Sequence, residues 1–213
     1  VPVKRCLIQP EAADKTAAAV GEWMRRYKVP AYDEATGKGL VRHVYVRVNR
    51  KGESLCCVVI NGRQAPREPE LAAYVCAAVP HTAGVLVNSN TKRGNVILGE
   101  RYRTLWGRDY LMDTLCGLEF KLSVPSFYQV NRDQAEALYG KALDYAGLTG
   151  RETVLDLYCG IGTISLCLAR RAGHVIGAEV VPQAIEDARA NALRNGVTNA
   201  ECFCGDAGEV AAR

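Results

Sequence analysis

The stretch Asp156–Thr163, DLYCGIGT, decides the fold of this 213-residue chain. It follows an apolar run that ends in Val154 and Leu155, and it precedes a helix-like segment, ISLCLARR. Gly160 and Gly162 therefore stand where a strand meets a helix. Glycines in such a place let the backbone approach a phosphate, a sugar or a cofactor closely. The residues around the loop must show which ligand it holds.

Strand-like and helix-like segments alternate through the rest of the chain. The segments, in order, are strand 153–160, helix 163–171, strand 174–180, helix 182–196 and strand 200–206. This alternation predicts an α/β fold with a parallel, doubly wound sheet of which three strands are present. Since Arg213 falls within the helical pattern AGEVAAR and the first residue is Val1, we expect a piece of a longer protein, truncated at both ends.

The pattern before this sheet changes near Pro125. The segment 126–148 has a polar start and then apolar residues at helical spacing, namely Ala135, Leu138, Ala142 and Leu143, before Gly147 ends the helix. We therefore predict two domains, a central mixed α/β domain at 1–124 and an incomplete Rossmann-like domain at 125–213.

The first 124 residues mix helices with hairpins. The predicted elements are a helix at 11–27 ended by Pro30, strands at 41–48 and 54–60, a helix at 68–79, strands at 83–90 and 95–100, and two strands within 108–123 that break at Gly117. The turn between the strands at 83–90 and 95–100 contains Lys92 and Arg93.

Composition narrows the class of protein. The chain is 48% hydrophobic and 23% charged, and its apolar runs are far shorter than a membrane span, so we expect no membrane partner. Nine cysteines without a C-x-x-C pair favour a reducing, cytoplasmic environment. Residues 1–120 carry 18 Lys and Arg against 12 Asp and Glu, an excess that permits a polyanion partner for this half.

Three acids narrow the ligand of the loop. Asp156 precedes Gly160 by four residues, and the resulting D-x-x-x-G-x-G pattern is typical of methyltransferases that use S-adenosylmethionine (SAM). Glu179 ends the second strand, where a carboxylate can accept both ribose hydroxyls, and Asp206 ends the third, where it can accept the adenine amino group. The third glycine of a dinucleotide motif is replaced by Ser165. A nicotinamide enzyme, or acids that only cap loops, remain the alternatives.

A second motif points to a family. SFYQVN (126–131), together with DLYCGIGT, resembles the RNA 5-methyluridine methyltransferases, which methylate uracil C5 in ribosomal or transfer RNA. The resemblance extends to 37–47, 88–99 and 177–196, so it covers nearly the whole chain, and it is strongest to the 23S ribosomal RNA branch.

The resemblance implies a set of SAM contacts. They are Gln129, Tyr158, Gly160, Gly162, Thr163, Glu179 and Asp206. Tyr158 would lie next to the methionine end, and the role of Thr163 differs among members of the family. The alternatives are that Tyr158 belongs to the core and that Gln129 caps a helix.

The chemistry of the family requires residues that we do not find in this chain. A cysteine thiolate adds to uracil C6, the resulting enolate attacks the methyl donor, and a base removes the C5 proton. In the family this cysteine and base come late in the sequence, so we expect them beyond Arg213 and assign no catalytic residue here. Cys159 belongs to the SAM motif and receives no nucleophilic role. We expect the chain alone to bind SAM weakly at best and not to methylate.

Cys6 is the candidate metal ligand. Its context, VKRCLIQ, resembles that of the fourth cysteine of a 4Fe–4S cluster found in ribosomal RNA members of the family, whose other three cysteines would precede Val1. The alternative is a buried thiol.

RNA is the expected partner, ribosomal rather than transfer RNA, with no DNA and with the protein as a monomer. The candidate contacts are Arg42, His43, Arg47, Lys92 and Arg93, although each could also be solvated surface. Two other functions stay open: a SAM methyltransferase with a different substrate, and an RNA-binding module that keeps a vestigial SAM site.

Overall fold

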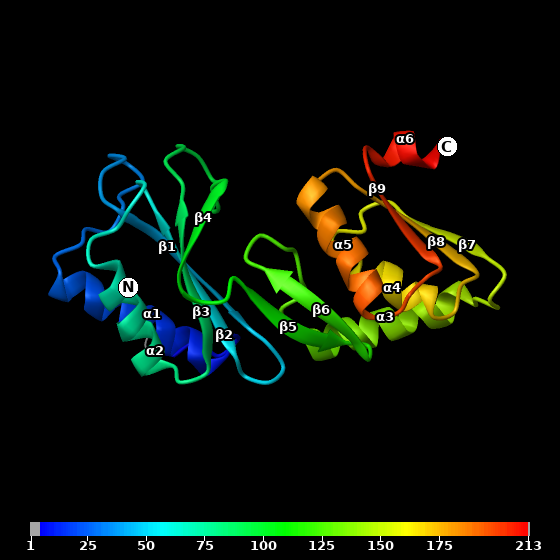
Figure 1. Ribbon diagram of the computed structural model, residues 1–213, viewed down its shortest axis with the longest axis horizontal. Helices are drawn as coiled ribbons and strands as arrows, with labels where there is room; N and C mark the ends of the chain where they lie inside the picture. Colours follow the sequence, from blue (N-terminus) through cyan, green and yellow to red (C-terminus); the bar gives the residue numbers. More distant parts are fainter. Residues whose placement is uncertain (1–4, 213) are drawn as a thin grey trace. The chain divides into compact units, whose positions relative to one another are not determined.

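The computed structural model describes residues 5–212, which form two compact units (Figure 1). The first unit runs to Leu111 and includes Ser123–Pro125, and the second consists of Met112–Leu122 and the chain from Ser126 onward. The hairpin before Pro125 therefore groups mainly with the second unit, whereas the sequence placed it in the first domain. The division into domains at 1–124 and 125–213 stays a prediction.

The first unit is a four-stranded mixed sheet with two helices. Its strands lie in the order β1-β2-β3-β4. β1 is antiparallel to β2, β2 is parallel to β3, and β3 is antiparallel to β4. The elements are α1 (Glu11–Arg26), β1 (Val41–Val48), β2 (Ser54–Ile60), α2 (Glu68–Ala78), β3 (Thr82–Ser89) and β4 (Arg101–Gly107). Apart from β4, these elements match the sequence prediction closely.

The core of this unit lies between the sheet and the two helices, which run together along it (Figure 1). Val20 and Trp23 of α1 and Leu71 of α2 pack in one cluster with alternate residues of the central strands, such as Val58 and Val85. Because these side chains alternate along β2 and β3, one face of the sheet receives both helices. The remaining residues of β2 are buried as well, so the apolar pattern of this strand predicts a central position in the sheet but not the face that the helices cover.

The strand predicted at 95–100 is wrong, because these residues form a loop and β4 begins at Arg101. The buried side chain of Asn88 explains the difference. Its amide nitrogen donates to the carbonyls of Gly99 (2.9 Å) and Arg101 (3.2 Å), and its oxygen accepts from the Gly99 N–H (2.7 Å). A side-chain amide thus supplies hydrogen bonds that a strand would have obtained from a neighbour.

The second unit contains a three-stranded parallel sheet in the order β7-β8-β9, with helices in the connections. This arrangement confirms the α/β, Rossmann-like fold predicted from the alternating segments. The elements are β5 (Tyr110–Leu115), β6 (Leu118–Ser123), α3 (Arg132–Ala146), β7 (Thr153–Asp156), α4 (Thr163–Ala169), β8 (His174–Glu179), α5 (Pro182–Arg194), β9 (Ala200–Cys204) and α6 (Ala207–Ala211).

The hairpin of β5 and β6 is attached to the helices of this unit at its turn. Cys116 and Gly117, the two turn residues, both have positive φ (52° and 74°), as in a type I′ hairpin. The Cys116 N–H donates to Glu136 of α3 at 2.8 Å, and Arg170, at the end of α4, donates to the Cys116 carbonyl at 2.6 Å. The hairpin is therefore part of the Rossmann-like unit.

Helix α3 leads from SFYQVN to the glycine loop, and its ends are as predicted. The Asn131 side chain caps the first turn by accepting from the Gln134 N–H at 3.3 Å, and Gly147 ends the helix with a left-handed φ of 58°. Tyr139, rather than Leu138, lies on the buried face, and Leu138 is exposed. None of the helices within residues 5–212 has the length and apolarity needed to cross a membrane.

Two glycines of α3 and its cap provide a test of this fold. A Cβ at Gly140, inside the helix, or at Gly147 would meet no atom within 4 Å, so only the backbone conformation distinguishes them. We expect Gly147→Ala to lower the free energy of unfolding by about 1–2 kcal/mol, because φ there is left-handed. Gly140→Ala, the matched control, should raise it by about 0.5–1 kcal/mol. Urea denaturation of both variants measures this, and equal effects of the same sign would contradict the assigned helix end.

Candidate functional site

The candidate site lies at the carboxyl edge of the parallel sheet. Asp156 ends β7 and Glu179 ends β8, while Asp206 follows β9. In the register of the sheet Asp156 pairs with Gly177, and Glu179 pairs with Cys204. All three predicted acids therefore lie along one edge, where ligands bind in open α/β sheets.

Asp156 holds the glycine loop from inside. One of its oxygens accepts from the Ser165 hydroxyl at 2.5 Å, and the other accepts from the Tyr158 N–H at 3.3 Å. Both oxygens are thus engaged within the loop and the first turn of α4. This geometry supports the interpretation that Asp156 stabilises the conformation of the loop.

The two glycines of the loop have different surroundings. Both have left-handed φ, 53° at Gly160 and 85° at Gly162. A Cβ at Gly160 would meet no atom within 4 Å, so this side of the loop faces open space. A Cβ at Gly162 would meet Ala188 of α5 at 3.4 Å, so this glycine lies against the helix. Gly160 therefore offers an accessible backbone to a ligand, and Gly162 allows the chain to pack.

Cys159 faces the sheet. Its N–H donates to the Ala178 carbonyl at 2.9 Å, and its thiol is buried with that of Cys202. A Cβ on Gly177 would lie 2.9 Å from the Cys159 sulfur and 3.3 Å from the Cys202 sulfur, so a glycine is needed beneath them. A hydrogen bond with Cys202, together with burial, raises the pKa of the Cys159 thiol. Both burial and protonation disfavour a nucleophilic role for Cys159.

Glu179 and Asp206 each have one oxygen fixed by the backbone. The Val181 N–H donates to Glu179 at 3.0 Å, and the Gly208 N–H donates to Asp206 at 2.8 Å, which caps α6. Within the described chain, no hydrogen bond is recorded to the second oxygen of either carboxylate. A carboxylate held in this way is oriented in advance to accept hydroxyl or amino groups.

The other predicted SAM contacts differ in their surroundings. Tyr158 is 82% exposed, so it does not belong to the core, and Gln129 is exposed and is not the cap of α3. Thr163 is half-buried, and its hydroxyl pairs with the Tyr139 hydroxyl at 3.2 Å. Burial raises the pKa of Tyr139, which keeps this pair neutral. The structure thus leaves Tyr158 and Gln129 accessible and engages Thr163 with α3.

The residues at this edge fit an adenosine-containing cofactor such as SAM. Two oriented carboxylates suit a ribose and an adenine amino group, and exposed apolar side chains beside them can contact the rings. These side chains are Tyr158 of the glycine loop and Val180 and Val181, which directly follow Glu179. Ser165, which stands where a dinucleotide motif has its third glycine, is fully buried and bonded to Asp156. The glycine that allows close helix–strand packing in a dinucleotide motif is therefore replaced by a serine whose hydroxyl binds the loop acid.

The sequence reasoning missed Asn191. This residue lies in the middle of α5 and is fully buried, and its side-chain amide donates to the carbonyl of Ile161 in the glycine loop at 3.2 Å. Its burial could have been predicted from the helical spacing, because Asn191 follows the apolar residues Ile185 and Ala188 on the same face of the helix. Asparagine has a low helix propensity, so a buried one within a helix indicates a specific partner.

Cys6, the candidate cluster ligand, contacts α1. Its N–H donates to Asp14 at 3.1 Å, and Asp14 also accepts from Gln9 at 2.6 Å. Within residues 5–212, no group of three or more His, Cys, Asp or Glu side chains is arranged to hold a metal ion. The iron–sulfur cluster stays a prediction.

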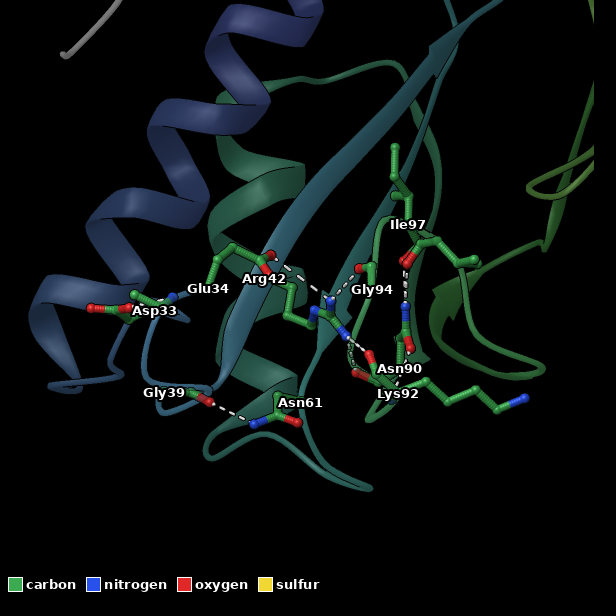
Figure 2. A network of polar contacts seen from close by, with 11 residues as sticks. Asp33, Glu34, Gly39, Arg42, Asn61, Asn90, Lys92, Gly94 and Ile97 are labelled. Carbon is green, nitrogen blue, oxygen red and sulfur yellow. Dashed lines mark hydrogen bonds and ion pairs between the residues drawn. The ribbon is translucent and has the colours of Figure 1, made fainter.

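Arg42 organises the loop between β3 and β4, as Figure 2 shows. Its side chain is 1% exposed and donates to the carbonyls of Asn90 (2.9 Å), Lys92 (2.7 Å) and Gly94 (3.5 Å). The expectation that Arg42 contacts RNA is therefore corrected, because its guanidinium is enclosed by the loop. The physical reason is that the loop has no ladder of its own and takes its hydrogen bonds from this side chain.

The other candidate RNA contacts differ in the exposure of their side chains. Arg47 donates to the Val124 carbonyl at 3.2 Å, and it is half-buried, as is His43. Lys92 is 78% exposed and pairs with Glu100 at 2.7 Å, and Arg93 is also exposed. Lys92 and Arg93 therefore remain the most accessible of the predicted contacts.

Substitution of Arg42 should unfold the loop rather than remove a surface charge. We expect Arg42→Ala to lower the free energy of unfolding by about 1–3 kcal/mol, because several carbonyls lose a donor. Lys92→Ala, the exposed cation of the same loop, should change it by less than about 0.5 kcal/mol. Thermal and urea denaturation measure both, and an Arg42→Ala protein as stable as Lys92→Ala would contradict this role.

Comparison with known proteins supports the fold of the site. Residues 148–212, which include the glycine loop, Glu179 and Asp206, match the family model described as a methyltransferase domain. This segment is the parallel sheet with its helices.

Two curated relatives align along nearly the whole chain. An uncharacterized RNA methyltransferase of Halalkalibacterium halodurans is 43% identical over 211 residues, which are 99% of this chain and 46% of the relative. Another, of Caldanaerobacter subterraneus subsp. tengcongensis, is 44% identical over 208 residues, which are 97% of this chain and 46% of the relative. The chain thus spans about half the length of the relatives it matches.

A solved structure shares the fold. The tRNA (uracil-54, C5)-methyltransferase of Pyrococcus abyssi, solved with S-adenosyl-L-homocysteine, superimposes with a TM-score of 0.79 at 23% identity. The match covers 97% of this chain and 50% of that one. The chain therefore has the fold of a Rossmann-like methyltransferase domain preceded by a mixed α/β unit.

Proposed function

We propose that this chain supplies the SAM site of an RNA methyltransferase that methylates uracil at C5. One observation carries the proposal: Glu179 and Asp206 stand as oriented carboxylates on the same sheet edge as the open side of Gly160. The RNA methyltransferases that align with the chain, and the uracil C5 enzyme that shares its fold, support the substrate class.

Each predicted residue has a part in holding SAM. Glu179 accepts the ribose hydroxyls, and Asp206 accepts the adenine amino group. The exposed Tyr158 and Gln129 contact the methionine portion, and Gly160 brings the loop backbone close to it. Thr163 acts through its hydroxyl pair with Tyr139, at the start of α4.

SAM, when bound, supplies an electrophilic methyl group. Uracil C5 is a poor nucleophile, so its activation requires a thiolate that adds to C6 and a base that removes the C5 proton. The buried, protonated Cys159 does not meet this requirement. We place the nucleophile and the base in the part of the protein that follows Arg213.

The RNA partner is proposed to be ribosomal. SFYQVN and the glycine loop resemble the 23S ribosomal RNA branch most strongly, whereas the solved structure that shares the fold acts on transfer RNA. Lys92 and Arg93, the accessible cations of the first unit, are proposed to contact phosphates.

Methyl transfer by the complete gene product tests the proposal. With tritiated SAM and purified ribosomal or transfer RNA, we expect label in 5-methyluridine of ribosomal RNA, identified after nuclease digestion. The 213-residue chain alone should transfer none. Label in another base, in protein or in a small molecule would overturn the uracil assignment, and SAM binding without transfer would favour the RNA-binding module with a vestigial site.

Glu179 provides the test of the cofactor site. Because the ribose hydroxyls would lose a charged acceptor, Glu179→Gln should weaken S-adenosylhomocysteine (SAH) binding about 10- to 100-fold. The matched control is Glu186→Gln, an exposed glutamate on α5 that bonds Gln183, and it should bind SAH as the parent protein does. Isothermal titration calorimetry measures both, and equal affinities would remove Glu179 from the site.

A further inference from the structure

Asn191 joins three elements of the second unit through one buried amide. Its nitrogen donates to the Ile161 carbonyl in the glycine loop at 3.2 Å, and its oxygen accepts from the Lys121 N–H of β6 at 2.9 Å. The residue itself belongs to α5 and is fully buried. The loop, the helix and the hairpin therefore meet at this side chain.

The two partners of the amide have opposite polarity. Because Lys121 presents an N–H and Ile161 presents a carbonyl, the Asn191 amide has one orientation that satisfies both. Because the Asn191 side chain is fully buried, water could replace either partner only if the surrounding side chains moved apart. The Lys121 backbone thus fixes the direction in which Asn191 donates to the loop.

The carbonyl of Ile161 belongs to the peptide unit between the two left-handed regions of the loop. The N–H of the same unit, on Gly162, donates to the Cys159 carbonyl at 2.8 Å. Asn191 and Cys159 therefore hold the two ends of one peptide plane. Because Gly162 contributes the φ of this plane and glycine has no Cβ, these two hydrogen bonds help to determine its orientation.

A neighbouring asparagine binds the β6 backbone as Asn191 does. Asn195, which caps the C-terminal end of α5, donates to the Glu119 carbonyl at 2.7 Å and accepts from the Glu119 N–H at 2.8 Å, and it also donates to the Asn191 carbonyl at 2.8 Å. Asn191 and Asn195 together thus satisfy the outer edge of β6. Asn195 makes no recorded hydrogen bond to the glycine loop within the described chain, so it serves as a control for attachment of the hairpin.

We propose that Asn191 is a positioning residue for the cofactor: by holding the Ile161–Gly162 peptide plane, it fixes the loop conformation in which the open side of Gly160 receives the methionine portion of SAM. The proposal rests on the proposed SAM site and adds to it a residue that does not touch the ligand. It also gives the β5–β6 hairpin a role, since the hairpin orients the amide through Lys121.

The test compares Asn191→Asp with Asn195→Asp in the complete gene product. Each aspartate keeps the shape of the side chain and its acceptor for β6, and each removes an N–H donor. Each also places a carboxylate oxygen against a carbonyl, that of Ile161 in the glycine loop for Asn191→Asp and that of Glu119 in β6 for Asn195→Asp. Binding of SAH and of adenosine is measured by calorimetry for both variants, and the melting temperature is measured alongside.

We expect Asn191→Asp to weaken SAH binding by about tenfold or more, while adenosine, which lacks the amino-acid portion, binds nearly as before. Asn195→Asp should lower the melting temperature and leave both affinities unchanged. This change in the ratio of SAH to adenosine affinity is a result that a merely structural role would not produce. Asn191→Leu, similar in size and uncharged, serves if the aspartate variant does not fold, and it should give the same ratio.

Three results would overturn the inference. They are equal SAH affinity of Asn191→Asp and the parent, equal weakening of SAH and adenosine, and failure of both Asn191 variants to fold, which would make the residue necessary for folding alone. Failure of the parent protein to bind SAH would instead overturn the proposed function. The parent titration thus separates the two.

Discussion

The structure of the second unit depends on one sharp reversal, in which the chain leaves β7 and enters α4 through two left-handed glycines. Three groups hold this reversal from different sides. Asp156 binds it from within, the Ala178 carbonyl receives the Cys159 N–H from β8, and Asn191 reaches the Ile161 carbonyl from α5. The open side of Gly160 is left as the place where a ligand can approach the backbone. The proposed cofactor site lies at this open side, where the bonds to Asp156, Ala178 and Asn191 leave the backbone of Gly160 accessible.

The first unit also contains an irregular segment that is held by hydrogen bonds from side chains. The segment 90–100 has no strand partner, and its carbonyls are satisfied by Arg42 and by the amides of Asn88 and Asn90. In both units, therefore, a buried polar side chain defines an irregular segment that backbone hydrogen bonds do not define. Such segments owe their shape to single residues, and their conformation is accordingly sensitive to single substitutions.

The sequence predicted most of the regular elements because their hydrophobic periods are clear, and it predicted the parallel sheet because strands and helices alternate from residue 153 onward. The predictions from sequence were wrong where buried polar side chains determine the local conformation. The run NVILGE has the composition of a strand, yet Asn88 binds Gly99 and keeps the segment a loop. Arg42 has the character of a surface cation, yet it is enclosed. The acids and glycines of the site were predictable from their spacing at strand ends, whereas Asn191 was not, because its partners lie 30 and 70 residues away.

The carboxyl edge of β7, β8 and β9 is the proposed binding site of SAM. Titration of SAH into the 15N-labelled 213-residue chain, followed by amide chemical shifts, tests it most directly and detects weak binding. We expect saturable shifts at Gly160, Gly162, Glu179 and Asp206, with the amide shifts of residues 5–111 unchanged. Shifts confined to other residues, or none at millimolar SAH, would contradict it.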